Sequence, residues 1–286
     1  MNMGLFRRKK KETSYVDGLV RRILATNPPR EEPKPYVARI PLPGYPVCED
    51  ILAQEHVLIG GTTGSGKSVL LNSIIFTGFN DYHFVFIDPK MIDLKKWAVS
   101  PKTDFYASHP AEALSALRAV RNEMWRRIQS IPPGANRFRG KQDIVVVIDE
   151  MAILLSYGRR EVIEILSEIM RLGRAAGIHI IAATQAPNRG KGGGIPAELQ
   201  QCFTASIGLR CRSAIESRQV VGVSGCETLP RYGQGIYWSP EGTRKIIIPM
   251  TSEEKLIEQV NIFNEATFWS PRYQMSLQTM PTRYPY

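Results

Sequence analysis

Eight residues from Gly61 to Ser68 fit the pattern G-x-x-x-x-G-K-[ST], which is typical of a turn that binds phosphate. The glycines let consecutive backbone N–H groups point at phosphate oxygens, and a helix that begins at Lys67 would add the positive end of its dipole. We expect Lys67 to reach the β- and γ-phosphates and Ser68 to bind Mg²⁺. A glycine-rich turn that binds nothing is the alternative, and the flanking strand and helix patterns argue against it. The nucleotide-contacting residues are then Gly61, Thr62, Thr63, Gly64, Ser65, Gly66, Lys67, Ser68 and Val69.

Two acidic residues, Asp149 and Glu150, follow directly after the apolar run 144–148. A carboxylate at the carboxyl end of a strand can hold Mg²⁺ or its water, and a second one can orient and activate the attacking water. We therefore assign Asp149 to the metal and Glu150 to the water, as catalytic residues beside Lys67. An ordinary acidic pair that opens a loop is the alternative, and the phosphate-binding pattern elsewhere in the chain favours the catalytic interpretation.

Another strand pattern, 178–183, ends in Thr184 and Gln185. A polar side chain at that position can contact the γ-phosphate or the attacking water. Gln185 is the better candidate because its amide reaches further and can both donate and accept a hydrogen bond. For Thr184, a polar group that only ends the strand is an equally good interpretation.

Strand and helix patterns alternate along the chain from residue 51 onward. Apolar runs that are continuous indicate strands buried on both faces, as in a parallel sheet covered by helices. We therefore expect an α/β fold with a mainly parallel central sheet and helices on both of its faces. The expected strands are 57–59, 84–87, 144–148, 178–183, 204–210 and 244–248, and the expected helices are 15–25, 67–79, 110–131, 160–175 and 252–266.

The positive charge of the chain is unevenly distributed. The 286 residues carry a formal charge of +10, with ten Lys/Arg against four Asp/Glu in residues 1–40 and 27 against 23 in residues 41–286. We expect 1–40 to be a basic, proline-rich tail and linker, 41–250 to be the main domain, and 251–286 to be a C-terminal helix and flexible tail. The basic run 7–11 could bind DNA or an anionic membrane, or could be a solvated tail.

Several protein classes are excluded by what the sequence lacks. Its four cysteines form no C-x-x-C pair and its four histidines are scattered, so neither set shows the spacing of metal ligands. No apolar run approaches the roughly 20 residues of a membrane span, and the basic N-terminus lacks the apolar stretch of a signal peptide. We expect a cytoplasmic protein that reaches a membrane, if at all, through a partner.

Several motifs resemble those of the FtsK/SpoIIIE DNA translocase motors. Their order and spacing also fit that family, and the similarity covers roughly residues 45–250. The motifs are Phe-Ile-Asp-Pro-Lys-Met at 86–91, Glu-Met-Trp-Arg-Arg at 123–127, Val-Ile-Asp-Glu-Met-Ala at 147–152, Gly-Arg-Ala-Ala-Gly-Ile-His-Ile-Ile-Ala-Ala-Thr-Gln-Ala-Pro at 173–187, Ile-Pro at 195–196 and Ser-Ala-Ile-Glu-Ser-Arg at 213–218.

The resemblance implies a RecA-like P-loop ATPase that uses ATP and Mg²⁺ and assembles as a ring, expected to be a hexamer, around double-stranded DNA. It also implies that ATP lies between subunits. Family members that act in cell division carry membrane spans and a winged-helix module, neither of which is found in these 286 residues. The chain therefore resembles a compact motor of a mobile element that works with a membrane-anchored or relaxase-type partner.

The resemblance also suggests an arginine that reaches the γ-phosphate of a neighbouring subunit. The candidates are Arg218, which we rank first, then Arg174, and Arg210; for each of them a surface or ion-paired arginine is the alternative. The family's T-Q-R-P motif has Ala186 in place of its arginine here, which removes that residue as a candidate.

Two basic loops are candidates for contact with DNA. Arg189 and Lys191 lie in the glycine-rich stretch 188–194, and Arg137 and Arg139 flank an aromatic residue in 137–141. Phosphate contacts of this kind are independent of base sequence, which suits movement along any DNA. Solvated loops are the alternative for both stretches.

We therefore expect an ATP-hydrolysing translocase of double-stranded DNA that serves DNA transfer by a mobile element or the movement of a chromosome or plasmid. A conjugative coupling or genome-packaging ATPase is the nearest alternative, and a secretion ATPase that acts on proteins is a more distant one. A regulatory subunit that binds ATP without hydrolysing it is disfavoured by the intact Lys67, Asp149 and Glu150.

Overall fold

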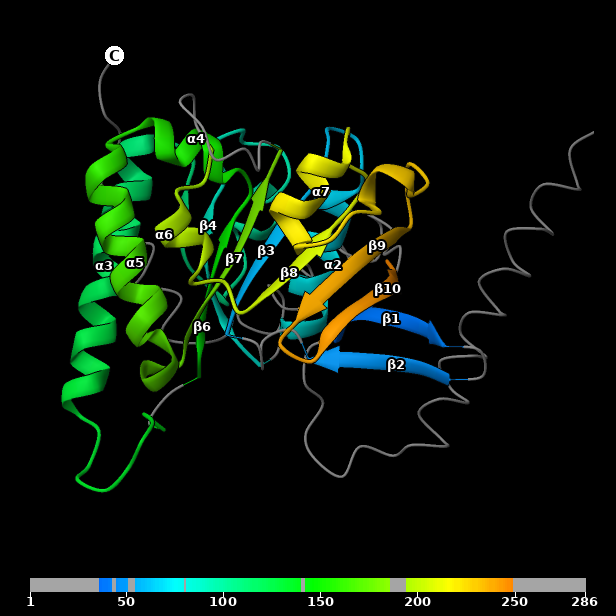
Figure 1. Ribbon diagram of the computed structural model, residues 1–286. Helices are drawn as coiled ribbons and strands as arrows, with labels where there is room; N and C mark the ends of the chain where they lie inside the picture. The colour runs from blue at the N-terminus through cyan, green and yellow to red at the C-terminus, as the bar shows by residue number, and fades with distance from the viewer. Residues whose placement is uncertain are drawn as a thin grey trace, which may run out of the picture.

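One ten-stranded sheet runs through the molecule, in the order β2-β1-β10-β9-β8-β3-β7-β6-β4-β5 (Figure 1). The computed structural model describes residues 36–42, 45–50, 55–79, 81–139, 142–185 and 194–248. The strands are β1 Tyr36–Leu42, β2 Tyr45–Asp50, β3 His56–Gly60, β4 His83–Ile87, β5 Thr103–Ala107, β6 Ile144–Ile148, β7 Ile178–Thr184, β8 Ala205–Gly208, β9 Gln234–Ser239 and β10 Gly242–Ile247.

The sheet has a parallel part and an antiparallel part. Strands β8, β3, β7, β6, β4 and β5 run parallel to one another, whereas β9, β10, β1 and β2 extend the β8 edge in antiparallel fashion. The helices are α2 Lys67–Gly78, α3 Pro110–Gln129, α4 Met151–Ser156, α5 Arg159–Ala176, α6 Ala197–Gln200 and α7 Ala214–Val221, with short 3₁₀ turns η2 Lys95–Trp97 and η3 Cys226–Thr228.

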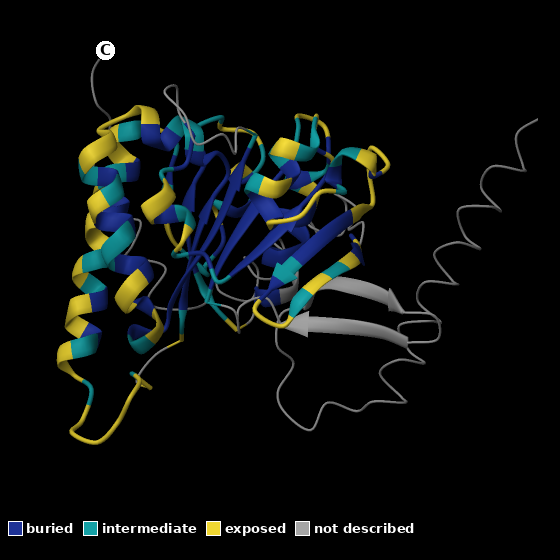
Figure 2. Cartoon of the chain, in the orientation of Figure 1, coloured by how far each residue is buried: buried dark blue, intermediate teal, exposed yellow. Residues whose placement is uncertain are grey.

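Helices cover both faces of the parallel strands, and this explains their continuous apolar sequences. Every residue of β3, β6 and β7 is buried (Figure 2). Successive side chains of a strand point to opposite faces of the sheet. Val145 and Val147 of β6 pack in the core layer that contains α2, whereas Val146 packs in the layer that contains α3 and α5. The predicted α/β architecture with a mainly parallel sheet is confirmed.

The structure also contains elements that the sequence did not predict. The strands β2, β5 and β9 and the helices α4 and α6 were missed, because each is short and lacks a long apolar period. Strand β1 begins at Tyr36, so the end of the stretch expected to be tail and linker lies in the sheet. The rest of that tail, the expected helices 15–25 and 252–266 and the C-terminal tail lie outside the described residues.

No helix in the described part of the chain is long and apolar enough to cross a membrane.

Parallel strands bring their carboxyl ends to one edge of the sheet. The register pairs Gly60 of β3 with Thr184 of β7 on one side and with Gly208 of β8 on the other. Ile148 of β6 pairs with Ile87 of β4 and with Ala182 of β7, so β4 and β6 end about two residues before β7 at the same edge of the sheet. This edge is where a parallel α/β sheet binds its ligands.

At the opposite edge, His56 begins β3 with its ring fully enclosed. Its Nε2 lies 3.0 Å from the carbonyl oxygen of Met170, and its Nδ1 accepts a hydrogen bond from the backbone N–H of Ile180. The ring is therefore neutral, with the proton on Nε2. Burial, together with the nearby His179, lowers the pKa of His56 from 6.5 to about 4.

We predict that stability decreases as the pH falls from 6.5 to 4, because in this range the unfolded chain binds a proton on His56 that the folded chain excludes. The contribution is complete above pH 6.5 and is on the order of 3 kcal/mol at most. Urea unfolding of the full chain at intervals between pH 7.5 and pH 4 measures it. His56→Gln should flatten this part of the pH profile, and equal slopes for the two proteins would contradict the prediction.

Candidate nucleotide site

The turn from Gly61 to Ser68 joins β3 to α2 and is held by the loops that follow two neighbouring strands. The backbone N–H of Gly61 donates to the carbonyl oxygen of Thr184, and that of Thr62 donates to the carbonyl oxygen of Arg210 at 2.9 Å. Gly64 and Gly66 have φ angles of 72° and 101°, which glycine adopts without strain. The turn is thus positioned by tertiary contacts as well as by its own sequence.

Lys67 is the first residue of α2, and its side chain folds back over this turn. Its Nζ donates hydrogen bonds to the carbonyl oxygens of Gly61 at 2.6 Å and Thr62 at 2.8 Å. Burial lowers the pKa of Lys67 from 10.5 to about 8, and the negative charge of Glu150 partly offsets this effect. The ammonium therefore has backbone partners but no directly bonded carboxylate, which leaves it suited to bind an anion.

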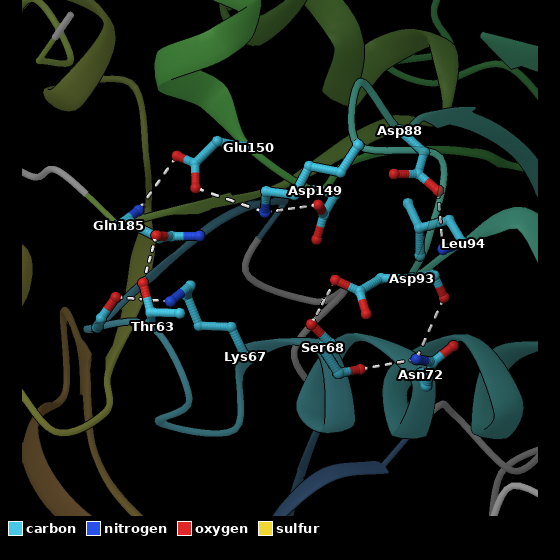
Figure 3. Close-up of polar contacts among 12 residues, drawn as sticks. Thr63, Lys67, Ser68, Asn72, Asp88, Asp93, Leu94, Asp149, Glu150 and Gln185 are labelled. Carbon is cyan, nitrogen blue, oxygen red and sulfur yellow. Dashed lines mark hydrogen bonds and ion pairs between the residues drawn. The ribbon is translucent and has the colours of Figure 1, made fainter. Parts of the chain in front are cut away.

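Ser68 connects α2 to the loop between β4 and β5 (Figure 3). Its hydroxyl donates to Asp93 Oδ2 at 2.7 Å, and its carbonyl oxygen accepts from Asn72 Nδ2. Asn72 Oδ1 in turn accepts from the indole N–H of the fully buried Trp97 at 2.7 Å. Asp88 holds the start of this loop by accepting the backbone N–H of Leu94. These bonds fix the β4–β5 loop against the first turn of α2.

Asp149 and Glu150 lie at the end of β6, and both are buried. The ammonium of Lys90 lies 2.8 Å from Asp149 Oδ2 and 3.6 Å from Glu150 Oε2. Burial raises the pKa of Asp149, and the hydrogen bond from Lys90 offsets only part of that effect. Glu150 Oε2 is buried and has no hydrogen-bond partner among the described residues, so the Lys90 ammonium offsets its charge at a distance longer than a hydrogen bond.

Gln185 links the phosphate-binding turn to these carboxylates. Its backbone N–H donates to Glu150 Oε1 at 3.1 Å, and its side-chain Oε1 accepts from the hydroxyl of Thr63 at 2.7 Å (Figure 3). Thr184 is buried at the end of β7 and contributes its carbonyl oxygen to the turn. The structure thus brings Lys67, Ser68, Asp149, Glu150 and Gln185 to one place, and the roles assigned to them stay predictions.

Comparison with known proteins identifies the protein family to which this domain belongs. Residues 19–139 match the FtsK/SpoIIIE family model. A protein named DNA translocase FtsK from Chlorobaculum tepidum is 34% identical over 68% of the chain, and one from Helicobacter pylori is 30% identical over 74%. The chain contains an FtsK/SpoIIIE-family domain. It spans 27% of the length of each of these two relatives.

Solved structures share the fold of this FtsK/SpoIIIE-family domain. The cytoplasmic domain of the type VII secretion ATPase EccC from Thermomonospora curvata covers 81% of the chain with a TM-score of 0.65 and 24% identity, and the chain covers 32% of it. The pCW3 conjugation coupling protein TcpA, in its monomer form with ATPγS, also covers 81% with a TM-score of 0.70 and 21% identity, and the chain covers 71% of it. The fold is that of the P-loop ATPases.

The arginines suggested by the family resemblance lie apart from one another. Arg174 is near the end of α5 and pairs with Glu55, which precedes β3, at 2.8 Å. It is therefore at the edge of the sheet opposite the phosphate-binding turn of its own chain. Arg218 is exposed on α7, whose Val220 packs against Gly60. Arg210 contributes its carbonyl oxygen to the turn and is exposed.

Of the four basic residues predicted to contact DNA, two lie within the described residues and two lie outside them. Arg137 forms an ion pair with Asp143, and Arg139 is exposed. Arg189 and Lys191 lie outside the described residues, as does Ala186. Val69, which was expected to contact the nucleotide, is partly exposed in the first turn of α2. The roles assigned to these residues stay predictions.

The donor atoms at the site fit a magnesium ion. Mg²⁺ prefers hard oxygen ligands and usually takes only one or two from the protein, with the rest from water and phosphate. Ser68 offers a hydroxyl, and Asp149 offers a carboxylate. Asp93, whose carboxylate already accepts from Ser68, offers a further oxygen atom beside them, and sequence reasoning missed it. In the described part of the chain no cluster of three or more His, Cys, Asp or Glu side chains could hold a metal alone.

Sequence reasoning also missed Lys90, although Asp-Pro-Lys at 88–90 was among the motifs that carry the resemblance. Only the fold shows that its ammonium lies close to the carboxylates of Asp149 and Glu150. Lys90 and Asp149 are 59 residues apart in the sequence. A lysine three residues after a buried strand has no local signal that identifies its partner.

We predict that Lys90→Met lowers the stability of this FtsK/SpoIIIE-family domain by about 2–3 kcal/mol, because Asp149 is then buried without its cation. Adding Asp149→Asn to that variant should recover at least about 1 kcal/mol, since the uncompensated charge is gone. Urea unfolding of both single variants and the double variant at pH 7.5 gives the coupling energy. Lys95→Met, at an exposed lysine of η2, is the control, and additive losses would contradict the prediction.

Proposed function

We propose that this domain hydrolyses ATP and uses the free energy to move along double-stranded DNA. The observation that carries the ATPase part of the proposal is the position of Glu150. One of its carboxylate oxygens is fixed by the N–H of Gln185, and the other lies 3.6 Å from the ammonium of Lys90 and has no hydrogen-bond partner in the described part of the chain. Such a carboxylate, buried beside a phosphate-binding turn, can accept a proton from an attacking water.

Each of the other site residues has a role in this reaction. The N–H groups of the turn and the ammonium of Lys67 bind the phosphates and stabilise the charge that develops on them. Ser68 and Asp149 would hold Mg²⁺, with Asp93 next to Ser68; bound there, the ion neutralises charge on the phosphate oxygens. Lys90 keeps Asp149 in place, and Gln185 orients the water or the γ-phosphate.

Gln185 also offers a physical connection between the nucleotide and DNA. It contacts Thr63 of the turn and Glu150, and the basic stretch 188–194 begins three residues after it in the sequence. A change in nucleotide state that altered either contact would be transmitted to the segment that carries Arg189 and Lys191. These two residues are the ones that we propose to contact DNA phosphates.

We further propose that the domain acts in a ring, expected to be a hexamer, in which a neighbouring subunit supplies an arginine to the γ-phosphate. Arg218 remains the first candidate because it is exposed on α7, which leaves its side chain accessible to a neighbouring subunit. A trans-acting arginine stabilises transition-state charge without adding to the site of its own chain. Membrane association would come from a membrane-anchored or relaxase-type partner.

We predict that Lys67→Ala abolishes nucleotide binding, because the phosphates lose their buried cation. Glu150→Gln should retain binding and reduce hydrolysis at least about 100-fold, because its amide cannot accept the proton. Fluorescence titration with a labelled ATP analogue and a phosphate-release assay separate the two effects. Glu164→Gln, at an exposed residue of α5, is the matched control. Undiminished hydrolysis by Glu150→Gln would show that another group activates the water.

We predict that long linear duplex DNA stimulates the ATPase rate several-fold, and that the stimulation declines as salt is raised from 50 to about 200 mM. The rate of the full chain is measured with and without DNA, with Lys67→Ala to exclude a contaminating ATPase. Displacement of a third strand from linear DNA in the presence of ATP tests movement directly. Stimulation by a peptide but not by duplex DNA would replace the proposal with a secretion ATPase.

A further inference from the structure

A positively charged side chain that none of the motifs includes lies against the phosphate-binding turn at Gly64. The guanidinium Nη2 of Arg231 is 3.5 Å from the position that a Cβ atom on Gly64 would occupy. Gly64 has a left-handed backbone conformation and no side chain, so the guanidinium can approach the backbone of the turn closely. The two residues are far apart in sequence, and their proximity is a result of the fold.

The topology explains why Arg231 reaches this place. Strand β9 runs antiparallel to β8, and its residue Ile236 pairs with Gly208 at the carboxyl end of β8. The loop that enters β9 must therefore lie at the same edge of the sheet as the turn after β3 (Figure 1). Arg231 belongs to this loop, which connects η3 to β9.

The loop is fixed at both ends. Before Arg231, the carbonyl oxygen of Leu229 accepts from the guanidinium of Arg210, whose own carbonyl oxygen holds Thr62. After it, the carbonyl oxygen of Gly233 accepts the backbone N–H of Ile248 at 3.0 Å. The position of Arg231 is thus tied to the turn itself through Arg210.

The guanidinium of Arg231 is held without an anionic partner. It stacks on the ring of Tyr232, with 5.1 Å between the guanidinium carbon and the ring centroid. Within the described residues it forms neither an ion pair nor a hydrogen bond. An exposed arginine that is oriented by an aromatic ring, and whose five donors have no partner in the described part of the chain, is well prepared to bind phosphate in bidentate geometry.

We propose that Arg231 is a second phosphate-binding cation of the nucleotide site, supplied by the same chain, which contacts the phosphate chain of a nucleoside triphosphate. The proposal rests on the nucleotide binding proposed above. Lys67 approaches the turn from α2, whereas Arg231 approaches it at Gly64 from the loop before β9. Because Arg231 acts within its own chain, it contributes to binding before any neighbouring subunit supplies an arginine.

Arg231→Ala and Arg231→Lys in the full chain test this role. Binding of a labelled, non-hydrolysable ATP analogue with Mg²⁺ is followed by fluorescence, and its displacement is measured with inorganic tripolyphosphate and with adenosine. Arg231→Ala should weaken the affinity for the analogue and for tripolyphosphate about tenfold, the size of one charge-assisted contact, and leave the affinity for adenosine unchanged. Arg231→Lys should recover part of the loss.

Two further variants separate the possible outcomes. Arg160→Ala, at an arginine of α5 whose side chain is 94% exposed, should bind like the wild type. If Lys67→Ala loses binding while Arg231→Ala keeps wild-type affinity for tripolyphosphate, the role of Arg231 is overturned and nucleotide binding stands. A loss confined to adenosine would make Arg231 a base-stacking residue, and a loss confined to duplex DNA would assign it to the DNA backbone; either result overturns the proposal.

Discussion

Asp149 and Glu150 are removed from water at the end of β6, next to one another and beside an apolar core. Burial of two adjacent negative charges is costly unless hydrogen bonds and a cation compensate for it. The compensation comes from the neighbouring strands: Lys90 from the loop after β4, and the N–H of Gln185 from the end of β7. The site therefore forms only when these three strands are in register.

The same requirement explains why the phosphate-binding turn is so firmly attached. Its backbone is bonded to the loops after β7 and β8, and its Thr63 hydroxyl reaches Gln185. On the other side, Ser68 and Asn72 of α2 bind the β4–β5 loop through Asp93 and Trp97. These hydrogen bonds connect the turn directly to the loops after β4, β7 and β8.

The antiparallel part of the sheet brings a basic side chain to the phosphate-binding turn. Because β9 enters beside the end of β8, its preceding loop lies next to the turn and brings Arg231 with it. A parallel strand in that position would have begun at the other edge. The reversal of direction after β8 is therefore the structural cause of the additional positive charge.

The sequence by itself determined what depends on local patterns. Continuous apolar runs identified β3, β4, β6 and β7, the glycine and lysine spacing identified the phosphate-binding turn, and Asp149 and Glu150 were found from their position after a strand. Those signals are local because burial on both faces and a tight turn each restrict a few consecutive residues. The partners of Asp149, Ser68 and Gly64 have no such signal. Lys90, Asp93 and Arg231 were assigned only by the tertiary structure, because an ion pair or a close approach between distant residues is set by strand order and direction, which no short stretch of sequence encodes.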